Sequence, residues 1–155
     1  MAIVVNKPLP EFEANATSGI KVSNTTHVGK TMVLYFYPKD NTPGCTTEAM
    51  QFRDKYKDFV KAGATVFGVS RDNMKSHDEF KTKLELPFEL IADTEEKMCH
   101  MFGVVKNKIM YGIEAKIKGN SQSDNQISFQ QLFHNPPSRI YLLAYTLEDI
   151  QKAVS

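Results

Sequence analysis

The sequence predicts a single α/β domain over residues 1–155, with a mostly parallel sheet that helices cover on both faces. Between residues 30 and 105, apolar runs rich in β-branched and aromatic residues alternate three times with segments of helical period. The 155 residues suit one domain with one core. Hydrophobic residues make up 41% and charged residues 24%, which is typical of a globular protein.

The first thirty residues predict one or two short edge strands. Apolar and polar residues alternate from Phe12 to Val22, and a turn is expected near Ser18 and Gly19. The next segment, residues 32–37 (MVLYFY), is a continuous apolar run. Such a run is typical of a central strand that is covered on both faces.

A helix is predicted after residue 46, with Gly63 as its stop signal. Residues 64–69 predict a second buried strand, and residues 73–84 predict a helix with Asp72 as its cap. The first helix is indicated by apolar residues at helical spacing, which are Ala49, Phe52, Tyr56, Phe59 and Val60.

Residues 87–91 predict a short strand. Asp93 and Glu96 then have the spacing of a capping box, so a helix is expected to run to about Phe102. The last third has weaker signals, because residues 115–138 are polar and amide-rich without a clear period. They predict a long loop, followed by a strand at 140–143 and a helix at 147–154.

Charge and composition exclude several function classes. The net charge of +1 gives no electrostatic reason to expect nucleic acid or a membrane surface as partner. No apolar run approaches the roughly 20 residues that span a bilayer, and the N-terminus lacks the pattern of a secretory signal. Two cysteines are too few for a disulfide-rich scaffold. A cytoplasmic protein with reduced thiols is therefore expected.

The segment from Pro38 to Glu48 joins the predicted central strand to the helix that follows. It places Cys45 at the helix N-terminus, near the carboxyl end of the strand, where ligands gather in open α/β sheets. Unpaired amides and the helix dipole there should lower the pKa of the thiol below the roughly 8.5 of a free cysteine. The thiolate is the nucleophilic form, and a peroxide converts it to sulfenic acid.

Neighbouring residues favour a reactive site over simple packing. The Thr42 hydroxyl is expected to bond the sulfur or a peroxide oxygen, and Pro38 to shield the pocket from water. The alternative is a small buried hydrophobe, which is the common role of a free cysteine. A Cys-x-x-Cys pair would indicate a disulfide oxidoreductase. Because Thr42 replaces its first thiol, the site is left with one-thiol chemistry on a small oxidant.

Pro38, Thr42 and Cys45 match the Pro-x-x-x-Thr-x-x-Cys signature of peroxiredoxins. The longer run of residues 35–49 resembles the subfamily of bacterioferritin comigratory protein, or peroxiredoxin Q, and the resemblance covers about residues 1–114. It implies a thioredoxin-like fold with a central mixed sheet and no metal or flavin cofactor. It also implies reduction of hydrogen peroxide and organic hydroperoxides, recycling by thioredoxin or a similar dithiol, and a monomer or weak dimer.

The chain departs from the resembled subfamily at its resolving positions. Met50 and the neighbourhood of Lys81 stand where relatives carry a resolving cysteine. The other thiol is Cys99, whose apolar neighbours favour a buried structural role. As a resolving cysteine it would have to bring its Cα within about 7 Å of that of Cys45, which requires local unfolding. A one-cysteine cycle with an external thiol is the simpler hypothesis.

The chain also departs at the family's arginine, which lies beside the reactive sulfur in relatives. Ala115 occupies that position here. Arg139, just before the predicted last strand, is a candidate replacement, since the chemistry needs a positive partner. The alternative is that Arg139 is an ordinary surface residue.

Two further function classes stay open on the sequence. The missing arginine motivates a catalytically impaired redox sensor or chaperone-like binder on the same fold, while the lack of Cys-x-x-Cys argues against a thiol-disulfide reductase. Glu48 is expected to suit the helix dipole and to orient polar groups of the pocket. The histidines lack the spacing of a metal site or a nucleophile–base pair, so surface or structural roles are expected for His27, His77, His100 and His134.

Overall fold

The computed structural model describes residues 10–28, 30–106, 109–110 and 140–144. The predicted long loop at 115–138 and the predicted final helix at 147–154 lie outside these residues. The strands are β1 (Glu13–Asn15), β2 (Lys21–Ser23), β3 (Thr31–Phe36), β4 (Ala64–Ser70), β5 (Glu89–Ala92), β6 (Val105–Lys106), β7 (Ile109–Met110) and β8 (Ile140–Ala144). The helices are α1 (Pro43–Asp54), α2 (Tyr56–Lys61), α3 (Met74–Leu84) and α4 (Lys97–Met101), with 3-10 turns at Thr17–Gly19 and Thr25–His27.

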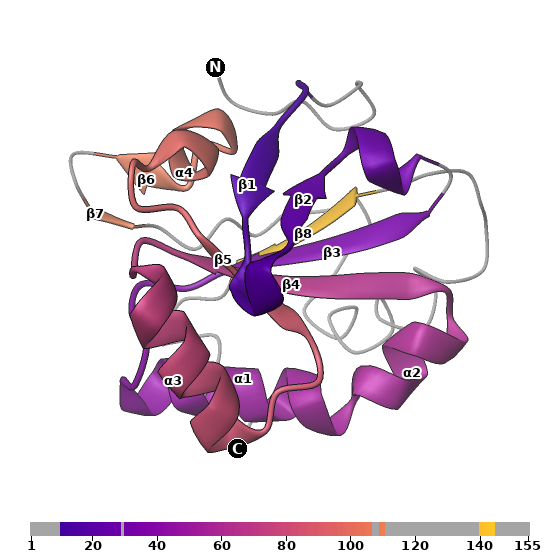
Figure 1. Cartoon of the computed structure of the whole chain (residues 1–155), viewed down its shortest axis with the longest axis vertical. Coiled ribbons are helices and arrows are strands. Elements are labelled where there is room, and N and C mark those ends of the chain that lie inside the picture. The colour runs from indigo at the N-terminus through magenta and orange to yellow at the C-terminus, as the bar shows by residue number, and fades with distance from the viewer. Residues whose placement is uncertain (1–9, 29, 107–108, 111–139, 145–155) are drawn as a thin grey trace, which may run out of the picture.

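The main sheet has the strand order β5-β4-β3-β8, and every pairing in it is parallel (Figure 1). The predicted central strand lies between β4 and β8, and the predicted last strand is β8. An isolated antiparallel bridge joins Ala16 to Ile91 of β5, so the edge of the sheet also has antiparallel pairing. The α/β class predicted from the sequence is confirmed.

Two hydrophobic cores lie on the two faces of the sheet. Val33 and Tyr35 of β3 pack in one core with α1, α2 and α3. Met32, Leu34 and Phe36 pack in the other with β1, β2 and α4. Figure 1 shows these two groups of elements on opposite sides of the sheet. Because each face is covered, both alternating sets of β3 side chains are apolar, which explains the continuous run in the sequence.

Residues 12–23 fold as predicted. β1 and β2 pair antiparallel, and the turn between them has Ser18 and Gly19 in the left-handed region, at φ 60° and 67°. Thr17 Oγ1 donates to the carboxylate of Glu89 and accepts from the amide of Leu90 at 3.0 Å. These bonds fasten the turn to β5.

The helices differ from the sequence predictions in three ways. The predicted helix after residue 46 is two helices, divided at Lys55, and Val60 is 54% exposed rather than packed. Asn73, not Asp72, caps α3, since its side chain accepts from the amide of Ser76 at 2.9 Å. The carboxylate of Asp72 instead accepts from the amide of Asp40 at 2.8 Å.

The start of α4 also differs from the predicted capping box. Asp93 does cap the helix, because its carboxylate accepts from the amides of Met98 and Cys99 at 3.0 and 2.7 Å. Glu96 does not complete the box, since its carboxylate bonds Arg71 at 3.1 Å. Asp93 therefore bonds amides five and six residues ahead, further along the chain than a capping box reaches.

Gly68 of β4 provides space for a buried tyrosine. A Cβ at this position would lie 2.7 Å from the hydroxyl of Tyr35 and 2.7 Å from Cδ2 of Leu90. Such contacts are closer than real Cβ atoms make, so glycine is required for β4 to pack against Tyr35. No helix among the described residues is long and apolar enough to cross a membrane.

Candidate active site

Cys45 is the third residue of α1, as the sequence predicts. The loop 38–42 connects the end of β3 to this helix. Pro43 stands at the first helical position, where its fixed φ favours the helix and its missing N–H costs no bond. Asn41 lies in the left-handed region at φ 60° and Thr42 is extended, so the chain turns sharply just before the helix.

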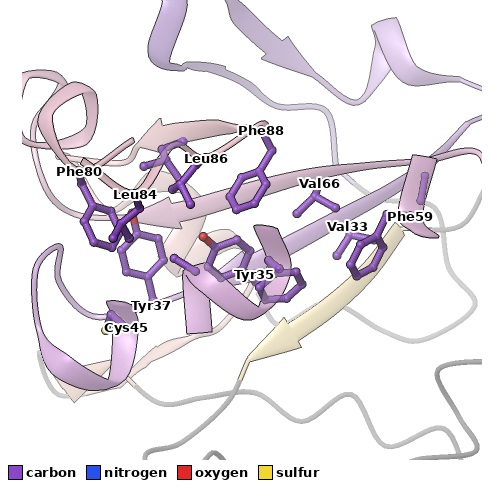
Figure 2. Close-up of a cluster of buried hydrophobic side chains, with 14 residues drawn as sticks. Val33, Tyr35, Tyr37, Cys45, Phe59, Val66, Phe80, Leu84, Leu86 and Phe88 are labelled. Atoms are coloured by element: carbon purple, nitrogen blue, oxygen red, sulfur yellow. The ribbon is translucent and has the colours of Figure 1, made fainter. Parts of the chain in front are cut away.

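The sulfur-bearing side chain lies at the edge of a hydrophobic core. Cys45 is 6% exposed and belongs to the cluster of Tyr37 and Ala49. Figure 2 shows it beside Tyr37, at one end of the cluster. Pro38 is exposed, and this cluster contains no proline. Core side chains bury Cys45, and the shielding role predicted for Pro38 stays a prediction.

The pKa of Cys45 is raised above its ordinary value, which corrects the prediction of a lowered one. Burial raises it most, and the carboxylates of Glu48 and Asp40 raise it further. Hydrogen bonds from the Thr42 side chain and the Lys39 backbone lower it, but by less. Within the described part of the chain, no cationic side chain contributes to the shift. Burial and the two acids therefore outweigh the hydrogen bonds that favour the thiolate.

Thr42 lies within hydrogen-bonding reach of the sulfur, as predicted. Its hydroxyl also has a second partner, the carbonyl oxygen of Lys39 at 3.1 Å. The single hydroxyl proton of Thr42 can be donated to the Lys39 carbonyl oxygen or to the Cys45 sulfur, but not to both. Donation to a thiolate therefore requires the bond to Lys39 to be released. Thr42 makes no side-chain bond to the helix that it precedes, which leaves first-turn amides of α1 available to an anion.

Glu48 is buried, which the sequence did not indicate. It is 3% exposed, and burial raises its pKa to about 8. Its Oε1 and the hydroxyl of Tyr35 are buried without a hydrogen-bond partner among the described residues. The one indication in the sequence was that Glu48 lies three residues after Cys45, because residues three apart on a helix share a face. Glu48 is therefore a neutral acid beside Cys45 near pH 7 rather than a charge facing the helix dipole.

The sequence did not indicate a role for Asp40 at the site, and it indicated only a surface or structural role for His77. Asp40 is 4% exposed and His77 is fully buried, and the two are hydrogen-bonded at 2.8 Å. The structural role expected for His77 is thus correct, but nothing in the sequence indicated its partner 37 residues away. A charged residue in a polar turn normally predicts solvent exposure.

Cys99 lies on the other face of the sheet from Cys45. It is fully buried in the core formed with β1, β2 and α4. Burial raises its pKa, and the neighbouring carboxylate of Asp93 raises it further. These observations favour the structural interpretation. Met50 is 37% exposed, and Lys81 pairs with Glu89.

Arg139 lies outside the described residues. The next residue, Ile140, begins β8 and pairs with Met32 near the amino end of β3. Cys45 follows the carboxyl end of that strand. The role predicted for Arg139 stays a prediction. Among the described residues, no group of three or more histidines, cysteines or acids is placed to hold a metal ion.

A family model described as the AhpC/TSA family matches residues 5–129 of the chain. The chain belongs to this family. Peroxiredoxin Bcp of Xanthomonas campestris is 44% identical over 111 residues, which are 70% of this chain and 69% of that protein. The resemblance to bacterioferritin comigratory protein and peroxiredoxin Q is thereby confirmed.

Solved structures agree with this assignment. The chain is similar to Xanthomonas campestris peroxiredoxin Q, with 44% identity and a TM-score of 0.60 over 61% of this chain and 60% of that one. It is also similar to the bacterioferritin comigratory protein of the same organism, whose structures concern alkyl peroxide reduction, with 40% identity and a TM-score of 0.60 over 64% and 66% of the two chains. The thioredoxin-like fold is therefore confirmed, and the peroxiredoxin is a thiol-dependent peroxidase.

Proposed function

We propose that this peroxiredoxin reduces hydrogen peroxide and organic hydroperoxides with Cys45 as its nucleophile. The observation that carries the proposal is the position of Cys45 in the first turn of α1, after a cap residue that leaves first-turn amides unpaired. The Cys45 thiolate attacks one peroxide oxygen and the O–O bond breaks. The sulfur loses two electrons and becomes a sulfenic acid, and the other oxygen leaves as alkoxide or hydroxide.

The leaving oxygen needs a proton. Glu48 is the described acid that suits this step, because its raised pKa of about 8 keeps it protonated at neutral pH. The helix spacing places it one turn from Cys45 on the same face. Thr42 supports attack by donating its hydroxyl proton to the sulfur anion or to the peroxide. Arg139 as an additional positive partner stays part of the proposal, and loss of more than tenfold in rate on Arg139→Ala would support it.

Recycling is proposed to use an external thiol. Cys99 is fully buried in the opposite core from Cys45, so a disulfide between them would require the sheet to open. In the simpler cycle, one thiol of a dithiol such as thioredoxin attacks the sulfenic acid and releases water. Its second thiol then displaces the Cys45 thiolate, and the dithiol leaves oxidised. The similar bacterioferritin comigratory protein of Xanthomonas campestris supports alkyl hydroperoxides as the substrate class.

The competing hypothesis is a redox sensor or chaperone-like binder with little turnover. The raised pKa of Cys45 favours it, because a protonated thiol is a poor nucleophile. Trapping with dimedone after one equivalent of peroxide, combined with a turnover assay, distinguishes these functions. Rapid labelling at Cys45 with sustained turnover supports the peroxidase, labelling without turnover supports a redox sensor, and absence of labelling supports the binder.

Turnover tests the proposal directly. Peroxide consumption is measured with thioredoxin, its reductase and a nicotinamide reductant. Cys45→Ser is expected to abolish consumption, while the matched variant Cys99→Ser keeps it. Wild-type consumption by Cys45→Ser would refute the proposal. A cytoplasmic location, a monomer or weak dimer, and the absence of nucleic acid and membrane partners stay predictions.

A further inference from the structure

The loop 38–42 is held in place mainly by one buried residue, Asp40. Its carboxylate accepts from the hydroxyls of Tyr37 and Ser76, each at 2.7 Å, and from Nδ1 of His77 at 2.8 Å. Its amide donates to the carboxylate of Asp72 at 2.8 Å. Asp40 thus joins the loop to the end of β3, to the segment after β4 and to α3.

The other described bonds of the loop do not replace these. Thr42 Oγ1 bonds Lys39 within the loop, and the Thr42 carbonyl accepts the amide of Thr46 as part of α1. The remaining contact, from Lys83 Nζ to Asn41 at 3.1 Å, is exposed, and surface contacts of this kind contribute little. Asp40 therefore sets the position of the chain five residues before Cys45.

His77 faces an acceptor at each ring nitrogen. Nδ1 lies 2.8 Å from the carboxylate of Asp40, and Nε2 lies 3.1 Å from the carbonyl oxygen of Ile91. A carbonyl oxygen cannot donate, so Nε2 must carry a proton. Burial alone would raise the pKa of Asp40, but hydrogen bonds from His77, Tyr37 and Ser76 outweigh it and lower the pKa. The imidazole of His77 thus bridges the Asp40 carboxylate and the backbone of β5.

The hydrogen bond between His77 and Asp40 is shielded from solvent. The side chain of His77 is 0% exposed and that of Asp40 is 1% exposed. Loss of one partner leaves a buried polar group of the other without its hydrogen bond, which is destabilising. The carbonyl of Ile91 belongs to β5, so the pair also fixes the loop relative to the sheet. A loop tied to both α3 and β5 has little freedom to shift.

We propose that His77 is a positioning residue for the peroxidase reaction, because its buried hydrogen bond with Asp40 holds the loop 38–42 and thereby Thr42 and Cys45 in their reactive arrangement. The inference rests on the proposed role of Cys45. This role differs from a purely structural one, because substitution of His77 is then expected to slow the attack by the sulfur more than it affects folding.

Two variants of His77 separate its hydrogen bonds. The side-chain nitrogen of asparagine lies near the position of Nδ1, so His77→Asn keeps a donor for Asp40. The nitrogen of glutamine lies near the position of Nε2, so His77→Gln keeps a donor for Ile91 and loses the one for Asp40. A structural role alone predicts similar losses in both variants, whereas the positioning role predicts that His77→Asn retains more activity.

The rate constant for oxidation of reduced Cys45 is measured by competition with horseradish peroxidase for hydrogen peroxide. His77→Gln is expected to lower it roughly 10- to 100-fold, since displacement of a reacting group by about 1 Å costs up to about 100-fold. His77→Asn is expected to recover most of the loss. Phe102→Leu, in the core on the other face of the sheet, is the control for general destabilisation and keeps the wild-type rate. Equal losses in all three variants, or a wild-type rate in His77→Gln, would overturn the inference.

A second measurement does not depend on activity. Hydrogen exchange of residues 39–46 in the reduced protein is expected to be faster in His77→Gln and Asp40→Asn than in wild type. The double variant is expected to exchange no faster than either single one, because both substitutions break the same pair. Unchanged exchange would overturn the inference even if Cys45 is the nucleophile. Faster exchange would support the loop anchor even if Cys45→Ser kept turnover and the proposed function failed.

Discussion

Burial of the Glu48 carboxyl predicts how the free energy of unfolding changes with pH. Its pKa is about 8 in the folded protein, against 4.5 for the free group. Between these values the unfolded chain has released the proton that the folded protein still binds. The free energy of unfolding of the wild type therefore falls as the pH rises from about 4.5 to about 8. Below this window the stability contribution of Glu48 is fully present. Glu48→Gln removes the titrating group and should abolish this loss.

The size of this loss in stability follows from the difference between the folded and unfolded pKa values of Glu48. Each pKa unit corresponds to about 1.4 kcal/mol, so a difference of about 3.5 units corresponds to roughly 5 kcal/mol across the full range. That is comparable with the whole stability of a small domain, about 5–15 kcal/mol. Relative to wild type, Glu48→Gln should gain about 1.4 kcal/mol per pH unit between pH 5 and pH 7.5.

Urea unfolding of the reduced protein, followed by circular dichroism at half-unit steps of pH, measures this difference. Contributions from ionisable groups that do not interact with Glu48 cancel between wild type and variant. Glu79→Gln, on the exposed side of α3, gives the baseline for removal of one carboxylate. A wild-type-to-Glu48→Gln difference that stays flat from pH 5 to pH 7.5 would refute the reasoning, because Glu48 would then be ionised in the folded protein.

Four further outcomes are expected. Alkylation of Cys45 by iodoacetamide should show a lower thiol pKa in Glu48→Gln, since the Glu48 charge raises it, and an unchanged pKa would contradict this coupling. Cys99→Ala should keep peroxide turnover within about twofold and yield no change in dimedone labelling, which a resolving role would alter. Gly68→Ala should destabilise the protein by about 1–3 kcal/mol in urea, because the added Cβ would lie 2.7 Å from a buried tyrosine hydroxyl. Asn73→Ala should cost about 1 kcal/mol of unfolding free energy through its lost helix cap, and no loss would mean that the cap is not formed in solution.

The sequence predicted the fold where periodicity was strong. The run at 32–37 and the strand at 64–69 became β3 and β4, because strands buried on both faces are continuously apolar. The caps were less predictable. Asp72 and Asn73 are adjacent residues of similar capping strength, and the choice between them depends on the amide of Asp40, 32 residues away. Such long-range competition leaves no local pattern.

The site was predicted in its position but not in its electrostatics. The Thr42-x-x-Cys45 spacing at a strand-to-helix junction correctly placed the cysteine at a helix start, since this depends on local order along the chain. The raised pKa of Cys45 depends on how deeply the first turn of α1 packs against Tyr37 and on the two acids that share the pocket. Packing depth is a tertiary property, and the same turn at a solvent-exposed edge would have lowered the pKa.

The raised pKa of Cys45 and the neutral state of Glu48 have a common origin. Both groups lose solvation in the same first turns of α1, and the charge of Glu48 raises the pKa of Cys45 further. Two such neighbours titrate as a pair, so the first proton to leave determines where the charge resides. A positive group or a peroxide hydrogen-bonded at the open amides of α1 would stabilise the charge on sulfur, and Glu48 would then retain its proton for the leaving oxygen. Burial that weakens the resting nucleophile thus also preserves the acid that completes the reaction.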